Sequence, residues 1–189
     1  MAEFTKHALA DSLVKLLETK RLDKIKIQEI VDGANVNRQT FYYHFSDIFA
    51  LTRYMVVGKY HDFLEKNGVD GIILEPTPLG IFLEMISRNK AIALNIYKGI
   101  EESQLRRALH EVVDPIIESE VRTIANGRLA EGDIKFAVAF FSSGYYGILL
   151  EWLNDDLDVE NRKRMESMLP LLEESLELLV ERLIQNRTI

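Results

Sequence analysis

Apolar residues recur at three- and four-residue steps along most of this chain, which is the spacing of helices with one buried face. Thr5 is a suitable N-cap residue, and the leucines that follow predict a first helix to about Lys20. A second, shorter apolar stripe is formed by Ile27, Ile30, Val31 and Ala34. The chain therefore opens on helices.

A tight turn is predicted directly after the second stripe. Gly33 and Asn35 are residue types that tolerate the left-handed backbone conformation, and Val36 supplies an apolar anchor after them. Residues 26–45 therefore predict a helix, a short turn and a second helix. In such a helix-turn-helix unit the second helix enters the DNA major groove, with its N-terminal residues first.

Further helices are predicted along the rest of the chain. Ser46 and Asp47 are suited to begin a long fourth helix that ends near Asn67, and glycines and prolines predict a loop over residues 67–80. The helical periodicity returns from Leu79 and continues over residues 88–100 as a separate helix. A longer helix is predicted over residues 103–125, where we expect Pro115 to kink or divide it.

The last two predicted helices are the most apolar part of the chain. Residues 133–153 include fifteen consecutive uncharged residues, too few for a membrane span of roughly 20. A helix that is apolar all round is expected to be buried on all sides. Residues 160–186 carry a narrower apolar seam. Together they predict a homodimer built as a four-helix bundle, the alternative being a well-buried core within one chain.

Composition narrows the class of protein. Hydrophobic residues make up 47% and charged residues 28%, with four prolines, ten glycines and few strand-like patterns, so we expect an all-α protein. The absence of cysteine excludes disulfides, thiolate metal sites and thiol catalysis. The first residues lack a secretory signal pattern, so a cytoplasmic location is expected.

Charge is distributed unevenly between the two ends of the chain. The net charge is −7, yet residues 1–60 hold nine Lys and Arg against seven Asp and Glu. A mildly basic head on an acidic body is compatible with DNA binding, because phosphate contacts dominate the affinity. The asymmetry alone is also found in enzymes.

The stretch from Asn37 to Phe45 carries the clearest functional pattern. Phe41 and Phe45 lie four residues apart, so on a helix they share one face and can anchor it to a core. Arg and Gln are side chains that pair with guanine and adenine edges in the major groove. The polar residues between the two rings are therefore candidates for DNA contacts.

Motifs of other chemistries are missing. No phosphate-binding glycine loop, dinucleotide fingerprint, nucleophile elbow or di-iron helix pair occurs, and we expect no catalytic residue and no cofactor. Three histidines have a carboxylate four residues later, but single pairs on helix faces are usually ion pairs, so no metal site is expected. These pairs are His7–Asp11, His61–Glu65 and His110–Asp114. Aromatic residues and methionines could line a ligand pocket or simply form core: Phe63, Phe82, Met85, Tyr97, Phe141 and Tyr145.

Residues 5–60 resemble the DNA-binding domain of the tetracycline-repressor (TetR) family of bacterial regulators. The likeness rests on the helix-turn-helix and on an aromatic signature that reads Thr-Phe-Tyr-Tyr-His-Phe at residues 40–45. A weaker likeness, at residues 141–153, is to the branch that contains the dihydroxyacetone-kinase operon activator. The resemblance implies a head at residues 1–46 that binds DNA and a body at residues 47–189 that dimerises and senses a ligand.

The resemblance also implies roles for individual residues. Base contacts are expected from Gln28, Asn37, Arg38 and Gln39. Phosphate contacts are expected from Lys26, Thr40, Tyr42, Tyr43 and His44. The lysines that the family often carries after this signature are replaced here by Ser46 and Asp47, so Lys24, Arg53 or a helix N-terminus would have to compensate.

The sequence thus predicts a one-component transcriptional regulator that binds double-stranded operator DNA as a homodimer through the helices at about 133–153 and 160–186. A small molecule or a partner protein would control it at the C-terminal domain, and no membrane is involved. The rival prediction is a helical-bundle enzyme or small-molecule binder whose N-terminal helices are only structural.

Overall fold

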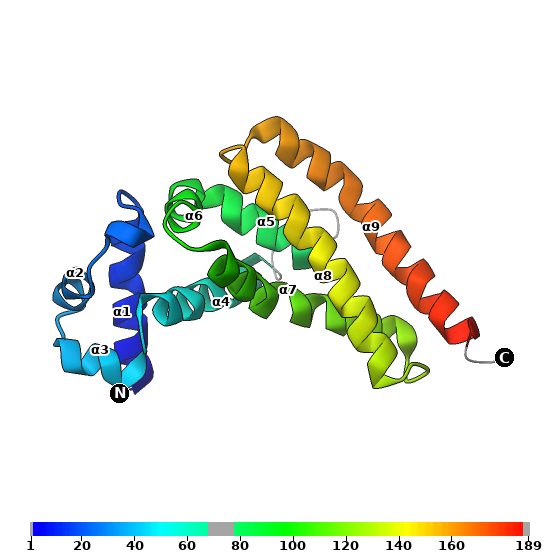
Figure 1. Ribbon diagram of the computed structural model, residues 1–189, viewed down its shortest axis with the longest axis horizontal. Helices are drawn as coiled ribbons and strands as arrows, with labels where there is room; N and C mark the ends of the chain where they lie inside the picture. Colours follow the sequence, from blue (N-terminus) through cyan, green and yellow to red (C-terminus); the bar gives the residue numbers. More distant parts are fainter. Residues whose placement is uncertain (1, 68–77, 187–189) are drawn as a thin grey trace. The chain divides into compact units, whose positions relative to one another are not determined.

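The computed structural model describes residues 2–67 and 78–186, and in these residues the chain is all-α, as predicted (Figure 1). A single 3-10 turn, η1, covers Leu22–Lys24. The α-helices of the described residues are α1 Ala2–Leu17, α2 Ile27–Gly33, α3 Arg38–His44, α4 Ile48–Asn67, α5 Pro78–Arg88, α6 Lys90–Tyr97, α7 Glu102–Ala125, α8 Glu131–Asn154 and α9 Val159–Asn186.

The chain divides into two compact units. The first comprises residues 1–75 and 81–108, and the second comprises residues 76–80 and 109–189. Helices α1–α4 and α6 therefore belong to the first unit, whereas α8 and α9 belong to the second. The functional boundary between residues 46 and 47 stays a prediction.

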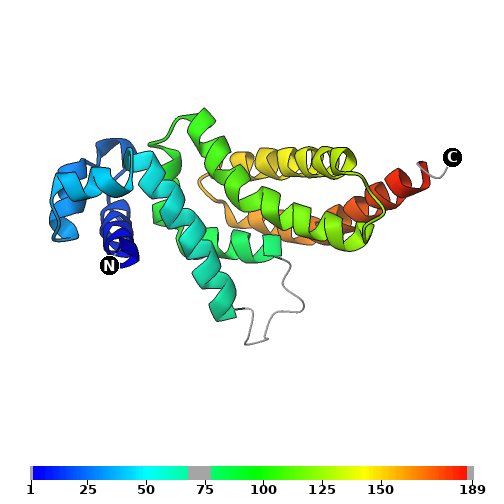
Figure 2. The ribbon, with the colours of Figure 1, turned by 90° about the horizontal axis from the view of Figure 1, so that it is seen from below.

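The first unit is built around the leucine stripe of α1. Leu9, Leu13 and Leu17 are fully buried, and they pack in one core with residues of α2, α3, α4 and α6. Figure 2 shows α1 in blue beside α2 and α3. The core of the head thus draws on a helix some fifty residues further along the chain than α3.

A close approach of α1 and α2 fixes the first half of the helix-turn-helix. The Ser12 hydroxyl donates a 2.8 Å hydrogen bond to the carbonyl of Ile30. A β-carbon on Gly33 would lie 2.3 Å from the Ser12 oxygen, so Gly33 is needed for this approach rather than for the turn. The left-handed residue of the turn is Asn35, with φ 55°, as the sequence predicted for one of the two positions.

Two helix starts can be compared with their predictions. Helix α1 begins at Ala2 rather than after Thr5, because Glu3 lies in the first turn and pairs with Lys6 at 2.7 Å. Asp47 does cap α4, since its carboxylate accepts a 2.8 Å hydrogen bond from the Ala50 amide. Most of the predicted loop at residues 67–80 lies outside the described residues.

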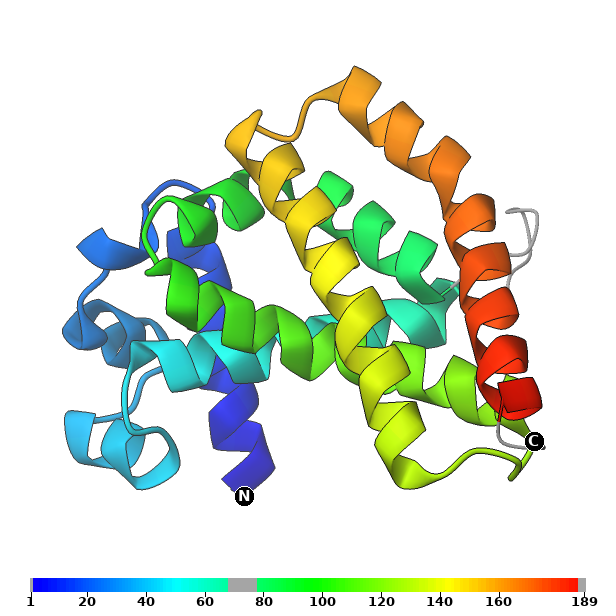
Figure 3. The ribbon, with the colours of Figure 1, turned by 45° about the vertical axis from the view of Figure 1, so that its right-hand side comes forward.

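The second unit contains the last part of α7 together with α8 and α9. Pro115 lies inside α7, which continues through it to Ala125, so the expected division does not occur. Trp152 is buried near the end of α8, and its indole N–H donates a 2.9 Å hydrogen bond to the Asp158 carbonyl just before α9 begins. This bond ties the α8–α9 connection to the core, and the two helices pack against each other (Figure 3).

Helix α8 is not buried on all sides within one chain, which corrects the prediction. Its inner face is buried, but Phe136 and Phe140 are 57% and 62% exposed, and Gly144 and Gly147 are exposed as well. The reason is that packing within the chain covers one face of α8 and leaves the opposite face open. By length and composition alone α8 could also cross a membrane, but a core helix meets the same criterion.

Candidate nucleic-acid interface

Helix α3 begins where Asn37 caps it. The Asn37 side-chain oxygen accepts hydrogen bonds from the backbone N–H of Thr40 at 2.8 Å and from the Thr40 hydroxyl at 3.0 Å. Asn37 itself has an extended backbone, so the helix covers Arg38–His44 only. The first side chains on α3 are therefore those of Arg38 and Gln39.

Two aromatic rings fix α3 to the head. Phe41 is fully buried, Phe45 is 8% exposed, and their ring centroids lie 6.0 Å apart. Both belong to the core that surrounds α1. The predicted anchoring role of these two residues is confirmed.

The polar side chains of α3 lie outside this core. Arg38 and Gln39 are exposed, as are Tyr42 at 52% and Tyr43 at 83%, whereas Thr40 and His44 are half-buried. The rings of Tyr43 and His44 meet edge to face at 5.0 Å. The Arg38 guanidinium makes no ion pair with the described residues. The structure therefore brings all the predicted α3 residues together on one short helix.

The two residues on and before α2 that were predicted to contact DNA, Gln28 and Lys26, also make hydrogen bonds within the protein. The Gln28 side-chain nitrogen donates a 2.7 Å hydrogen bond to Asp32, which leaves its carboxamide oxygen without a partner among the described residues. Lys26 precedes α2 and its side chain is exposed, while its backbone N–H donates to Glu29 at 3.0 Å. The Lys20 ammonium donates a 2.5 Å hydrogen bond to Glu29, and this bond is the main reason that the pKa of the Glu29 carboxyl is lowered. The hydrogen bond from the Lys26 backbone lowers the pKa further.

The position after α3 where the family often carries lysines holds a helix cap in this chain. The N-terminus of α4 is capped by the negative Asp47 carboxylate, which takes the Ala50 N–H and opposes a phosphate at the same place. Lys24 lies 3.5 Å from Asp23 and is partly neutralised by it. Arg53, the other cation considered for this role, lies on α4 and is half-buried.

A separate surface groove lies in the second unit, between α7 and α8. It encloses about 310 Å³ and is lined by apolar, charged and hydroxyl side chains. His110 and Asp114 lie 2.9 Å apart in it, the one histidine–carboxylate pair of the three predicted for which a contact is described. The lining residues are His110, Asp114, Glu118, Ile134, Lys135, Val138, Ala139 and Ser143.

Sequence reasoning missed this groove. The six aromatic and methionine candidates do not line it, and they are divided between the two units, with Phe82 and Met85 buried in the first and Phe141 in the second. The available signal was the spacing of His110, Asp114 and Glu118, which places three polar side chains along one face of α7.

Comparison with protein families found a match in the C-terminal part of the chain. A family model described as a transcriptional regulator C-terminal region, TetR_C_8, matches residues 79–174. The match covers about half of the chain and lies beyond the helix-turn-helix, so it is independent of the aromatic signature at residues 40–45. A search of curated proteins found no match.

Proposed function

The chain belongs to the TetR family of transcriptional regulators, and from this membership we propose that it binds operator DNA as a homodimer under the control of its C-terminal domain. The head binds the DNA, and the helices beyond residue 46 dimerise and receive the controlling signal. The protein works in the cytoplasm, where its operator lies.

The observation that carries this proposal is the division of labour along α3. Phe41 and Phe45 are committed to the core, whereas Arg38, Gln39, Tyr42 and Tyr43 project from it without being buried. A helix held by its rings while its polar residues stay exposed is suited to enter a major groove. A purely structural helix has no need of exposed tyrosines at two neighbouring positions.

The proposed contacts follow from the hydrogen-bond donors and acceptors that each side chain does not use within the protein. Arg38 and Gln39 read base edges, the first by a bidentate contact with guanine. Asn37 and Gln28 assist with the atoms that their internal bonds leave open, namely the Asn37 amide nitrogen and the Gln28 oxygen. Phosphates are held by a second set of side chains: Lys26, Thr40, Tyr42, Tyr43 and His44.

Dimerisation is proposed through the open faces of α8 and α9. On α8 the exposed face carries Phe136 and Phe140, followed by Gly144 and Gly147, where an added β-carbon would meet no atom within 4 Å. On α9 the exposed apolar residues include Met168, Leu171 and Leu178. Two such helices from each chain would form a four-helix bundle, and the glycines would allow a close helix crossing.

The controlling signal is either a small molecule or a partner protein. The groove between α7 and α8 is a candidate site for the former, because apolar side chains, the His110–Asp114 pair and Lys135 line it together. The weaker likeness of residues 141–153 to the activator branch favours the latter. Calorimetry with candidate metabolites, set beside a pull-down, separates the two cases.

A gel-shift experiment tests the proposal. The purified protein is titrated against its own upstream region, together with Arg38→Ala, Tyr42→Ala and the control Lys15→Ala. Lys15 is also an exposed cation of the head, but it lies on α1. We expect Arg38→Ala to weaken binding by about 10- to 100-fold, the effect of one lost bidentate base contact, and Lys15→Ala to have little effect.

Two outcomes of the gel-shift experiment would contradict the proposal. If Arg38→Ala and Tyr42→Ala stay folded and bind DNA as the unaltered protein does, α3 is not the recognition helix. If no variant and no unaltered protein binds any duplex, the rival class of helical-bundle enzyme or small-molecule binder is favoured.

A further inference from the structure

The end of α6 is built into the DNA-binding head. Ile96 of α6 is buried in the same core as Leu13, Leu17 and Phe41, and α6 packs directly on α1. All these residues belong to the first unit. The head and α6 are therefore one packed body, although more than forty residues separate them in sequence.

Helices α1 and α6 satisfy each other's C-terminal carbonyls. The Asn95 side-chain amide of α6 donates a 2.9 Å hydrogen bond to the carbonyl of Leu17, the last residue of α1. In return, the Arg21 guanidinium donates to the carbonyl of Lys98, the C-cap of α6. The last carbonyls of a helix have no partner within it, so each helix end here is completed by the other helix or its extension.

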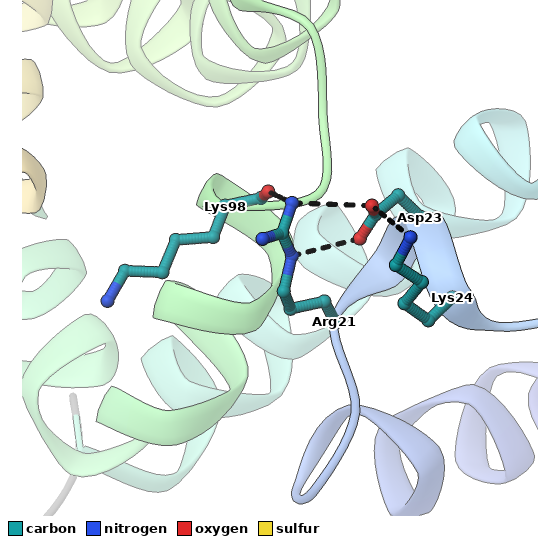
Figure 4. Close-up of polar contacts among 4 residues, drawn as sticks. All are labelled: Arg21, Asp23, Lys24 and Lys98. Atoms are coloured by element: carbon teal, nitrogen blue, oxygen red, sulfur yellow. Dashed lines mark hydrogen bonds and ion pairs between the residues drawn. The ribbon is translucent and has the colours of Figure 1, made fainter.

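Arg21 is held in place for this contact. Its guanidinium bonds Asp23 through two nitrogens, at 3.0 and 3.3 Å, while it donates to the Lys98 carbonyl (Figure 4). Asp23 also lies 3.5 Å from Lys24. A fixed planar fork that donates to a carboxylate and a carbonyl at once is a geometry that arginine supplies and lysine does not.

Gly99 permits the closest approach of the two segments. A β-carbon at this position would lie 2.7 Å from the backbone nitrogens of both Leu22 and Asp23, and 3.0 Å from the Leu22 β-carbon. The neighbours are backbone atoms, which cannot turn away as a flexible side chain would. Any other residue at position 99 must push the α6 end away from η1.

We propose that Arg21, Asn95 and Gly99 form a joint that positions the DNA-binding head on α6, and that operator binding depends on this joint although none of its residues contacts DNA. The proposal rests on the proposed function, because it concerns two heads of a dimer that must meet two half-sites together. None of the three residues of the joint lies on α3, which is anchored by Phe41 and Phe45. Opening it should loosen the head as a body and leave α3 folded.

Binding to two DNA duplexes distinguishes an effect on the position of the head from an effect on its stability. Gly99→Ala and the control Gly58→Ala are titrated against a full operator with two half-sites and against a duplex with one. Gly58 lies on α4 in the same unit, and an added β-carbon there would meet nothing within 4 Å. We expect Gly99→Ala to lose about tenfold or more on the full operator and less than about twofold on the single half-site, because a loose head lowers the effective concentration for the second contact.

Hydrogen exchange on the same proteins gives a readout that needs no DNA. The amides of Lys98 and Gly99 are bonded to Leu94 and Ile96, and the Ile25 amide is bonded to Leu22. In Gly99→Ala these amides should exchange faster, while those of Phe41 and Phe45, bonded to Asn37 and Phe41, keep their protection. Arg21→Met should act in the same direction, and Arg21→Lys should recover only part of the loss.

Each other outcome has a defined meaning. Equal losses on both duplexes, with lost protection at Phe41, would show that the joint only stabilises the head. Indistinguishable behaviour of Gly99→Ala and Gly58→Ala would show that the joint is not needed. If the unaltered protein binds neither duplex, the proposed function fails and the positioning role with it, while the exchange data still decide whether the α1–α6 joint exists.

Discussion

At Asn37, the cap of α3 and the proposed base contact require the same side chain. Its oxygen already accepts two hydrogen bonds from Thr40, at 2.8 and 3.0 Å. A bidentate contact with adenine needs both the oxygen and the nitrogen of the carboxamide. Asn37 can therefore contact a base through its nitrogen without uncapping α3, and the bidentate contact would cost the cap.

Replacing Asn37 tests this assignment. Asn37→Ala should lower the free energy of unfolding by about 1 kcal/mol, the usual cost of a lost N-cap, measured by urea unfolding at fixed protein concentration. Asn37→Asp is the matched variant, because its carboxylate keeps the cap but repels phosphates. It should keep stability and lose DNA affinity. An Asn37→Ala protein as stable as the unaltered one would refute the capping role.

Residue patterns predicted the anchors of the site but not its internal bonds. The four-residue spacing of Phe41 and Phe45 was enough to assign their burial, because the helix period fixes which side chains share a face. The helix period could not predict the hydrogen bond from Gln28 to Asp32 or the bond by which Asp47 caps α4. Both depend on which rotamer a polar side chain adopts among several acceptors within reach.

At the scale of an element, α7 carries two glutamates of opposite character two residues apart. The Glu118 side chain is 44% exposed and lies 2.7 Å from Arg122, which also bonds Glu131 at the start of α8. Glu120 is half-buried, and burial raises the pKa of its carboxyl, with the negative charge of Glu173 on α9 adding to the effect. The Glu118 carboxylate thus stabilises the fold through its ion pair with Arg122, whereas the ionised Glu120 carboxylate destabilises it.

This difference predicts mutational effects of opposite sign. Because the folded-state pKa of Glu120 is raised, its stability contribution is full below the unfolded-state pKa and is lost as pH rises through the folded-state value. Glu120→Gln should therefore stabilise the protein at about pH 7 and flatten its pH dependence. Glu118→Gln should destabilise it by no more than about 0.5 kcal/mol, since the pair with Arg122 is exposed.

Urea unfolding of both variants at about pH 5 and about pH 7 checks this prediction. The effect of Glu120→Gln should be larger at the higher pH. A loss of stability in Glu120→Gln at pH 7 would mean that its carboxylate is needed inside the bundle.

Element boundaries were less predictable than element identity. Helix α1 begins three residues before Thr5, because an acidic residue and a lysine in the first turn favour helix where apolar periodicity gives no signal. Pro115 was expected to kink or divide α7, and the helix is not divided but runs on to Ala125, with Ile116 and Ile117 after the proline both buried. Tertiary packing outweighed the local cost of the proline.

At the scale of the whole molecule, α8 and α9 both carry apolar side chains that the rest of the chain leaves exposed. Exposed aromatic rings next to exposed glycines are costly for a surface that faces water alone. The uncharged run at residues 136–150 predicted burial of this helix on all sides, and it did not indicate which face the chain leaves open. The joint of α6 with the head could not be predicted, because it depends on contacts between segments more than seventy residues apart.

A charge on this face tests the dimer. Phe140→Glu should weaken self-association by about 100-fold or more, because a carboxylate would be buried at the helix crossing, and sedimentation velocity reads out the change. Phe4→Glu is the control. It is the same substitution at a residue that is 80% exposed and lies on α1, outside the proposed interface. A Phe140→Glu protein that sediments as the unaltered one does would place the interface elsewhere.

The most direct test of the central claim is the salt dependence of binding to the protein's own upstream DNA. Fluorescence anisotropy is recorded at several salt concentrations for the unaltered protein, Lys26→Ala and Arg38→Ala. We expect a linear fall of log affinity with log salt. Lys26→Ala should reduce that slope by about one on each contacted half-site, and Arg38→Ala should remove preference for the operator over unrelated DNA. Salt-insensitive binding, or variants indistinguishable from the unaltered protein, would contradict the assignment of α3 and the residue before α2 to DNA.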